Sequence, residues 1–167
     1  MAHAVVRTDR MYGTDVDPGL VSVKYIGAAS TETAIDNGNV VLLNGLMTGE
    51  REVYAGITPA ANSALKDIVL IATPELMYDE RLKNLDDFYN LAGGISRAYH
   101  LHTSDIFSVT AEALTAEADI AVGNIVELAA STKLNVVSSV TEGSTVVGRV
   151  IAIDVVGRYT YYAIEVA

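Results

Sequence analysis

Apolar and polar residues alternate along most of the chain with the period of two that is typical of β-strands. Residues 20–26 show this pattern clearly, because Val21, Val23 and Tyr25 fall on one face of an extended segment that follows a Pro-Gly turn. Further strands are predicted at residues 39–43, 67–73, 97–101, 106–110, 124–128, 134–140, 146–155 and 159–166. Short strands at near-regular spacing favour a small β-barrel or sandwich.

Some segments allow more specific predictions. Residues 67–73 contain an uninterrupted apolar run, which predicts a strand that is buried on both faces. In the pairs Asn37-Gly38 and Asn44-Gly45 the glycine readily adopts a positive φ, and we expect tight turns there. Residues 156–158 separate the last two strands and predict a hairpin.

One segment follows the helical period instead. Leu85, Phe88 and Leu91 would share one face of a short helix over residues 84–91. Gly93-Gly94 would end this helix. The predicted fold class is therefore mainly β, a β-barrel or sandwich with one short α-helix and only minor α+β character.

The beginning of the chain differs from the rest, because it contains few apolar residues and several turn signals. We interpret residues 1–19 as an N-terminal arm that becomes ordered when it contacts a partner. Residues 20–167 are predicted to form a single β-rich domain, which could divide into lobes at residues 20–110 and 111–167. The chain has 167 residues, which is enough to bury a core.

The chain is acidic, with 21 Asp and Glu residues, 11 Lys and Arg residues and a formal net charge of -10. Neutralisation of phosphates needs clustered Lys and Arg, so binding to nucleic acid or to an anionic membrane is not expected. The chain has no cysteine, no signal-peptide pattern at its start, and no apolar run of the roughly 20 residues that a membrane span needs. We therefore expect synthesis in the cytoplasm.

Two groups of side chains were candidates for a metal site. His100 and His102 would point to the same side of a strand and are followed by Asp105, but no third histidine lies nearby, and the histidines would face water if Tyr99 and Leu101 point inward. The second group consists of Asp79, Glu80, Asp86 and Asp87. Acidic residues also collect near helix N-termini for electrostatic reasons, and Arg81 lies among them. Since a serine-nucleophile motif and a phosphate-binding glycine loop are absent from the sequence, we expect no enzyme activity, no cofactor and no metal.

Tyrosine dominates the aromatic residues, with nine tyrosines, two phenylalanines and no tryptophan. A tyrosine ring suits a half-exposed contact with protein or sugar, although packing on a sheet face explains the same pattern. A contact role for the tyrosines and for the N-terminal arm predicts a partner-binding set. This set consists of Val5, Val6, Arg7, Arg10, Tyr12, Tyr159 and Tyr161.

One stretch of the chain resembles a known group of proteins. Residues 73–93 read TPELMYDERLKNLDDFYNLAG, followed by RAYHL at residues 97–101 and DIFSVT at residues 105–110. This stretch resembles small head proteins of tailed phages that infect Gram-positive hosts, which are encoded beside the major capsid protein. The resemblance extends over about residues 40–130.

The resemblance implies a capsid decoration or cement protein, made in the cytoplasm of the bacterial host and located in the virion, on the outer surface of the head. Its partners would be the major capsid protein and further copies of itself, as a dimer or trimer that matches the symmetry of the shell. Modest contacts that repeat over a closed lattice would act together. A tail-tube or head–tail connector subunit and a glycan-binding module of the virion are the alternatives.

Overall fold

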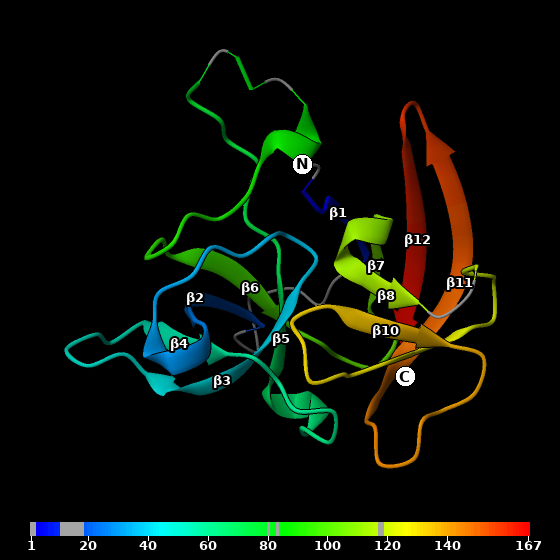
Figure 1. Cartoon of the computed structure of the whole chain (residues 1–167), viewed down its shortest axis with the longest axis horizontal. Helices are drawn as coiled ribbons and strands as arrows, with labels where there is room; N and C mark the ends of the chain where they lie inside the picture. The colour runs from blue at the N-terminus through cyan, green and yellow to red at the C-terminus, as the bar shows by residue number, and fades with distance from the viewer. Residues whose placement is uncertain (1–2, 11–18, 80, 83, 117–118) are drawn as a thin grey trace.

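The computed structural model describes residues 3–10, 19–79, 81–82, 84–116 and 119–167, and its regular structure is almost entirely β (Figure 1). The strands are β1 (Val6–Arg10), β2 (Leu20–Ile26), β3 (Val40–Leu46), β4 (Val53–Ile57), β5 (Ile68–Ile71), β6 (Ser96–His100), β7 (Ile106–Val109), β8 (Leu114–Ala116), β9 (Ile125–Glu127), β10 (Leu134–Val137), β11 (Val146–Val156) and β12 (Tyr159–Val166). They form one sheet of seven strands and one of five, so the predicted mainly-β class is confirmed.

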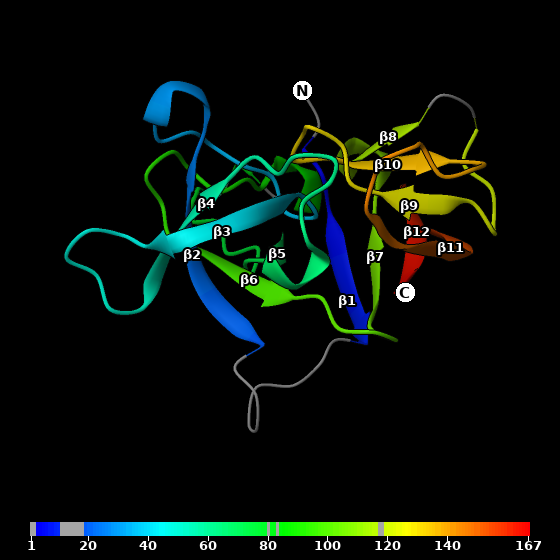
Figure 2. The same ribbon diagram turned by 90° about the horizontal axis from the view of Figure 1, so that it is seen from below.

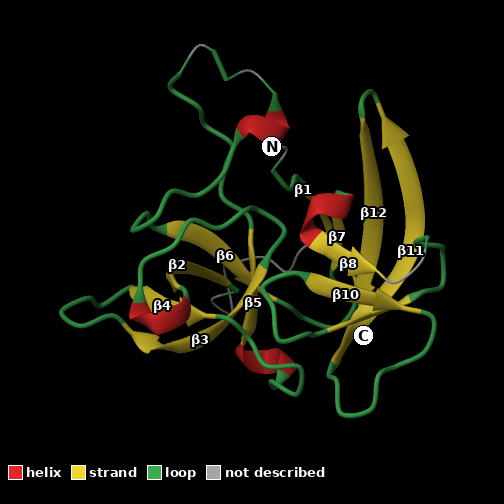
Figure 3. Cartoon of the chain, in the orientation of Figure 1, coloured by secondary structure: helices red, strands yellow, loops and turns green. Residues whose placement is uncertain are grey.

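Helical structure in the described ranges is limited to 3₁₀ turns, none of which could cross a membrane (Figure 3). The turns are η1 (Ala28–Ser30), η2 (Leu65–Asp67), η3 (Leu85–Asp87) and η4 (Ala111–Ala113). The predicted α-helix over residues 84–91 is wrong, because only η3 forms there. Phe88 leaves the turn with an extended backbone, and Asn90 pairs with Ile35 in an antiparallel bridge. This tertiary pairing overrides the local helical period.

The five-stranded sheet closes into a barrel in the order β2-β4-β3-β5-β6, with β6 paired back to β2. β2 and β4 run parallel, and the other neighbours are antiparallel. The core inside the barrel consists of Val23, Ile35, Val41, Val69, Ile71 and Ala98. Gly56 of β4 is required here, because a Cβ at this position would lie 2.5 Å from Val23 Cγ1. The narrow barrel therefore has no room for a further side chain.

The seven-stranded sheet packs against the outside of the barrel. Its order is β1-β7-β12-β11-β9-β10-β8, and within it only β8 and β10 are parallel. β1 lies on the side of this sheet that is nearest the barrel (Figure 2). The second core contains Val40 and Leu70 from the barrel together with Phe107 and Ile164 from the sheet. The two sheets thus share one apolar interface.

β5 forms a wall between the two cores. Val69 and Ile71 belong to the core inside the barrel. Ile68 and Leu70 belong to the core beneath the seven-stranded sheet, and all four side chains are completely buried. The prediction that this strand is buried on both faces is confirmed.

The predicted N-terminal arm is a strand over part of its length. β1 pairs with β7, with Val6 opposite Val109. Val5 is buried, and its backbone N–H donates to Thr110 Oγ1 at 3.1 Å. Residues 3–10 therefore belong to the folded domain, which corrects the predicted boundary. The pattern of β1 is weak in the sequence because an edge strand needs few apolar side chains.

The division between the two groups of strands also differs from the predicted lobes. A boundary after residue 110 places β7 with the barrel, whereas β7 pairs with β1 and β12 in the seven-stranded sheet. The division falls between β6 and β7. β1 and β12, the two strands that pair with β7, lie far from it in the sequence, so this pairing could not be predicted from local spacing.

The two predicted Asn-Gly turns have different roles. The glycines have the expected positive φ, 82° at Gly38 and 80° at Gly45. Gly38 precedes β3, but Gly45 lies inside β3, where the pairing with β4 shifts register between Leu43 and Leu46. The hairpin predicted at residues 156–158 is confirmed, since β11 and β12 are antiparallel neighbours.

Replacement of Leu70 should test the wall directly. We expect Leu70→Ala to lower the free energy of unfolding by about 2–5 kcal/mol in urea denaturation, because the lost side chain leaves a cavity between completely buried neighbours. Leu76→Ala is the matched control: its side chain is 69% exposed, and its loss should cost less than about 0.5 kcal/mol. Equal losses in the two variants would contradict the position of β5 in the core.

Glu127 of β9 is a buried carboxylate with its own hydrogen-bond donors. It accepts from Asn135 Nδ2 at 3.0 Å and from the Thr141 backbone N–H at 2.9 Å. Burial alone would raise the pKa of Glu127, but these hydrogen bonds outweigh the burial and hold the pKa below its ordinary value. The ionised carboxylate therefore stabilises the fold.

This stabilisation should depend on pH. Because the pKa of Glu127 is lower in the folded state, its contribution is present above the pKa of an unfolded glutamate, about 4.3, and disappears as the pH falls through the folded pKa. At neutral pH we expect Glu127→Gln to lower the free energy of unfolding by about 1–3 kcal/mol. The difference between the variant and the wild type should shrink in urea denaturation from about pH 6 to about pH 3. A difference that does not change with pH would refute this role.

Candidate protein-interaction surface

The connection between β5 and β6 is a long loop that projects from the rest of the molecule (Figure 1, Figure 3). We refer to residues 74–95 as the 74–95 loop. Its exposed large apolar side chains are Leu76, Tyr78, Leu82, Leu85, Tyr89, Leu91 and Ile95. Most of them line a groove of about 370 Å³, together with Met77 and Phe88. A concentration of exposed apolar side chains on one segment is typical of a protein-binding surface.

Two buried asparagines fix both ends of this loop at its base. Asn37 Nδ2 donates to Thr73 O at 2.7 Å, and the Thr73 backbone N–H donates to Asn37 Oδ1 at 3.0 Å. Asn90 Nδ2 donates to Asn37 Oδ1 and to Ile35 O, both at 3.1 Å. Because the amides are buried and their hydrogen bonds are made inside the chain, they fix the base of the loop.

The N-terminal segment supports the middle of the loop. The His3 backbone N–H donates to Asp86 O at 3.0 Å. The His3 ring stacks on Tyr89 with the ring centroids 4.7 Å apart, and His3 Nδ1 lies 3.0 Å from Asp36 Oδ1. The chain that precedes β1 therefore contacts the loop directly.

The Asp86 carboxylate joins the loop to the turn of the β11–β12 hairpin. Asp86 Oδ2 accepts a hydrogen bond from Arg158 Nη2 at 2.6 Å, and Asp86 Oδ1 accepts one from Tyr159 OH at 2.8 Å. We call these three residues the Asp86 clasp. The Asp86 side chain is only 13% exposed, which strengthens its ion pair with Arg158. Burial and the hydrogen bond to Asp86 raise the pKa of Tyr159, so its hydroxyl keeps the proton that it donates.

Three members of the predicted partner-binding set lie close together, but they contact groups of the chain itself. Arg7 Nη2 donates to Asp154 Oδ2 at 3.2 Å, and the Arg7 guanidinium lies 4.9 Å from the centroid of the Tyr161 ring. The ring centroids of Tyr159 and Tyr161 are 6.1 Å apart. Tyr161 is 5% exposed, so it has little surface to present to a protein or a sugar.

The other members of that set belong to the N-terminal segment. Val5 is buried and Val6 packs against the second core, so both side chains stabilise the fold. Arg10 is the last residue of β1, and its side chain lies outside the described residues. Tyr12 lies outside them altogether. Contact roles for Arg10 and Tyr12 stay predictions.

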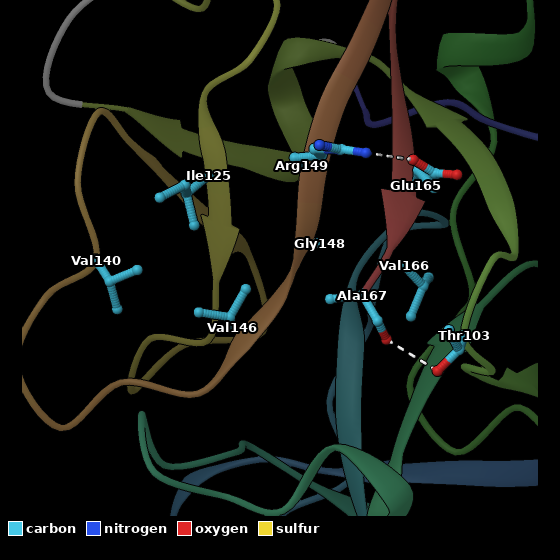
Figure 4. A pocket seen from close by; sticks show the side chains of 9 residues that line it. All are labelled: Thr103, Ile125, Val140, Val146, Gly148, Arg149, Glu165, Val166 and Ala167. Carbon is cyan, nitrogen blue, oxygen red and sulfur yellow. Dashed lines mark hydrogen bonds and ion pairs between the residues drawn. The ribbon is translucent and has the colours of Figure 1, made fainter.

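A second apolar groove lies at the far end of the β11–β12 hairpin (Figure 4). Its volume is about 460 Å³, and it is lined by Thr103, Ile125, Val140, Val146, Gly148, Arg149, Glu165, Val166 and Ala167. The charged groups at this groove pair with each other, with Arg149 Nη2 3.3 Å from Glu165 Oε2. The 74–95 loop is the stronger candidate, because it gathers more exposed large apolar side chains on one segment.

The side chains considered for a metal ion have other contacts. The His102 backbone N–H donates to Asp105 Oδ2 at 3.0 Å. Asp79 forms an ion pair with Arg81 at 2.6 Å, and hydrogen bonds from Arg81 hold the pKa of Asp79 below its ordinary value. Glu80 lies outside the described residues. In the part of the chain that the structure describes, no group of three or more His, Asp or Glu side chains could hold a metal ion.

The chain matches no protein-family model, no curated protein and no solved structure. The strongest functional feature is therefore the 74–95 loop, together with the contacts that hold its base and its middle.

The residues that shape the loop have no recognisable signal in the sequence. The pattern around Asn37 indicates a turn, and the predicted helix places Asp86 on its outer face. The decisive partners lie far along the chain, since Arg158 is 72 residues from Asp86 and Asn90 is 53 residues from Asn37. Sequence reasoning from local spacing therefore misses both contacts.

Removal of the Asn37 amide should loosen the base of the loop. We expect Asn37→Ala to lower the free energy of unfolding by about 1–3 kcal/mol in urea denaturation, because the backbone N–H and C=O of Thr73 lose their partners and Asn90 Nδ2 loses one of its two acceptors. Asn44→Ala is the matched control, since Asn44 is exposed, and it should cost less than about 0.5 kcal/mol. A loss for Asn37→Ala as small as that of the control would show that this amide does not fix the loop.

Proposed function

We propose that this protein is a non-enzymatic structural subunit that binds the outer surface of a tailed-phage head and stabilises it. The observation that carries the proposal is the exposed apolar surface of the 74–95 loop, whose base and middle are held by hydrogen bonds to the rest of the chain. Nearly the same residues, 73–93, carry the resemblance to phage head proteins. The major capsid protein is the proposed partner.

The loop is suited to binding because its order is established when the chain folds. Asn37, Asn90 and the Asp86 clasp fix its base and its middle. A partner that covers the groove does not have to order the loop again, so more of the energy of apolar burial contributes to affinity. Tyr78 and Leu91, which are 96% and 66% exposed, can enter depressions on the partner.

The charge of the chain restricts the kind of surface that it can bind. A net charge of -10 opposes contact with acidic surfaces, and it favours a partner surface that is neutral or basic. Within the loop, Arg81 already compensates Asp79. A contact of modest strength is sufficient on a capsid, because equivalent sites repeat over the shell and several copies of the protein can act together.

Co-sedimentation with empty, expanded capsids of the source phage tests the proposal, with unexpanded precursor shells as the comparison. We expect saturable binding to the expanded shells only. Leu76→Asp and Leu91→Asp should each weaken binding about tenfold or more, because a charge would be buried in the contact. Val122→Asp is the matched control, because Val122 is also an exposed apolar side chain, at 60%, but lies outside the loop.

The other outcomes are equally informative. Failure of the wild-type protein to bind either shell would reject the decoration role. Assembly of the purified protein into rings or tubes would then favour a connector or tail-tube subunit. Equal binding by Leu91→Asp and Val122→Asp would show that the 74–95 loop does not contact the shell.

A further inference from the structure

Three segments that are distant in the sequence meet at Asp86. Its backbone carbonyl accepts a hydrogen bond from the His3 N–H at 3.0 Å. Its carboxylate accepts hydrogen bonds from Arg158 at 2.6 Å and from Tyr159 at 2.8 Å. One residue of the 74–95 loop thus contacts both the chain that precedes β1 and the β11–β12 hairpin.

The hairpin turn that Asp86 holds presents apolar side chains of its own. Val155 is 75% exposed and Val156 is 51% exposed. Val156 lies opposite Tyr159 in the last pair of the hairpin ladder, and the hydroxyl of Tyr159 reaches Asp86. The turn and the loop also project on the same side of the molecule (Figure 1). Val156 therefore lies on the face of the hairpin that carries Tyr159 and is held on the side of the loop, whereas Val155, which pairs with Thr160, lies on the opposite face.

The remaining contacts of the turn show how Asp86 joins it to the 74–95 loop. The Arg158 guanidinium lies 5.3 Å from the centroid of the Tyr159 ring, so both donors to Asp86 are packed together. The Asp86 side chain is 13% exposed, whereas that of Arg158 is 57% exposed. The Asp86 carboxylate is thus largely buried between the 74–95 loop and the hairpin turn. Without it, the loop and the turn would lose the hydrogen bonds that join them.

We propose that Asp86 is a positioning residue, which holds the turn of the β11–β12 hairpin against the 74–95 loop so that both contact the same capsid subunit. The partner in this inference rests on the proposed function, whereas the positioning itself is a property of the isolated protein. Shell binding would then depend on two apolar elements, the loop groove and Val156 of the hairpin.

Hydrogen exchange of the full chain tests the positioning. Asp86→Asn keeps the size of the side chain but removes its charge, and Arg158→Ala removes the partner. The amides of His3 and Phe88 donate to the backbone carbonyls of Asp86 and Leu85 in η3. Both variants should speed hydrogen exchange of these two amides by about tenfold or more. Exchange in the completely buried strand β5 should not change. Arg149→Ala is the matched control, because it breaks the Arg149–Glu165 pair at the far end of the same hairpin and should leave these amides unchanged.

The same variants are then compared in shell binding. Asp86→Asn and Val156→Asp should each weaken binding about tenfold, whereas Arg149→Ala should bind like the wild type. Unchanged exchange in both clasp variants would overturn the positioning role. Faster exchange with unchanged shell binding by Asp86→Asn would overturn its role in the contact. If the wild type binds no shell, the proposed function and the joint contact are both rejected, and the exchange rates alone decide whether Asp86 positions the turn.

Discussion

The packing of β5 between two cores is the contact on which the rest of the structure depends. Its residues alternate between the inside of the barrel and the interface with the seven-stranded sheet, and neighbouring strands β3 and β6 bond both of its edges. Every side chain of this strand is completely buried. A shift of the register of β5 by one residue would exchange the two sets of side chains. This strand therefore fixes both the register of strand pairing in the barrel and the position at which the seven-stranded sheet packs.

The 74–95 loop inherits its position from this wall. The loop begins just after β5 and returns into β6, and these strands are antiparallel neighbours, so its two ends are held close together. Asn37 lies just before β3, the other neighbour of β5, which places its amide at the base of the loop. An exposed apolar segment is thus attached to a strand whose side chains are all completely buried. This arrangement allows a projecting loop to keep a defined shape.

The sequence pattern predicted the strands that can be recognised from their own residues. It failed for segments whose conformation depends on contacts with residues far along the chain. β2 and β12 follow the simple alternation of a sheet, and β5 follows a continuous apolar run, so these strands were predictable. β4 was missed because it contains Ala55 and Gly56, small residues that only the narrow barrel explains. The helical period near Phe88 was misleading, since the bridge between Asn90 and Ile35 keeps that segment extended. The Asp86 clasp joins residues 72 positions apart, which no local spacing reveals.

The central place of β12 has a consequence for how the protein is made. β12 lies between β7 and β11, yet it follows every other strand along the chain. On the ribosome, all five barrel strands emerge first, while the strand that links the two halves of the second sheet is still being translated. Until it arrives, the second core, which includes Val40, Ile68 and Leu70 on the outside of the barrel, lacks Ile164 and Val166 of β12. A nascent chain that pauses before β12 is synthesised would therefore expose apolar surface, which would make it prone to aggregation and a substrate for chaperones.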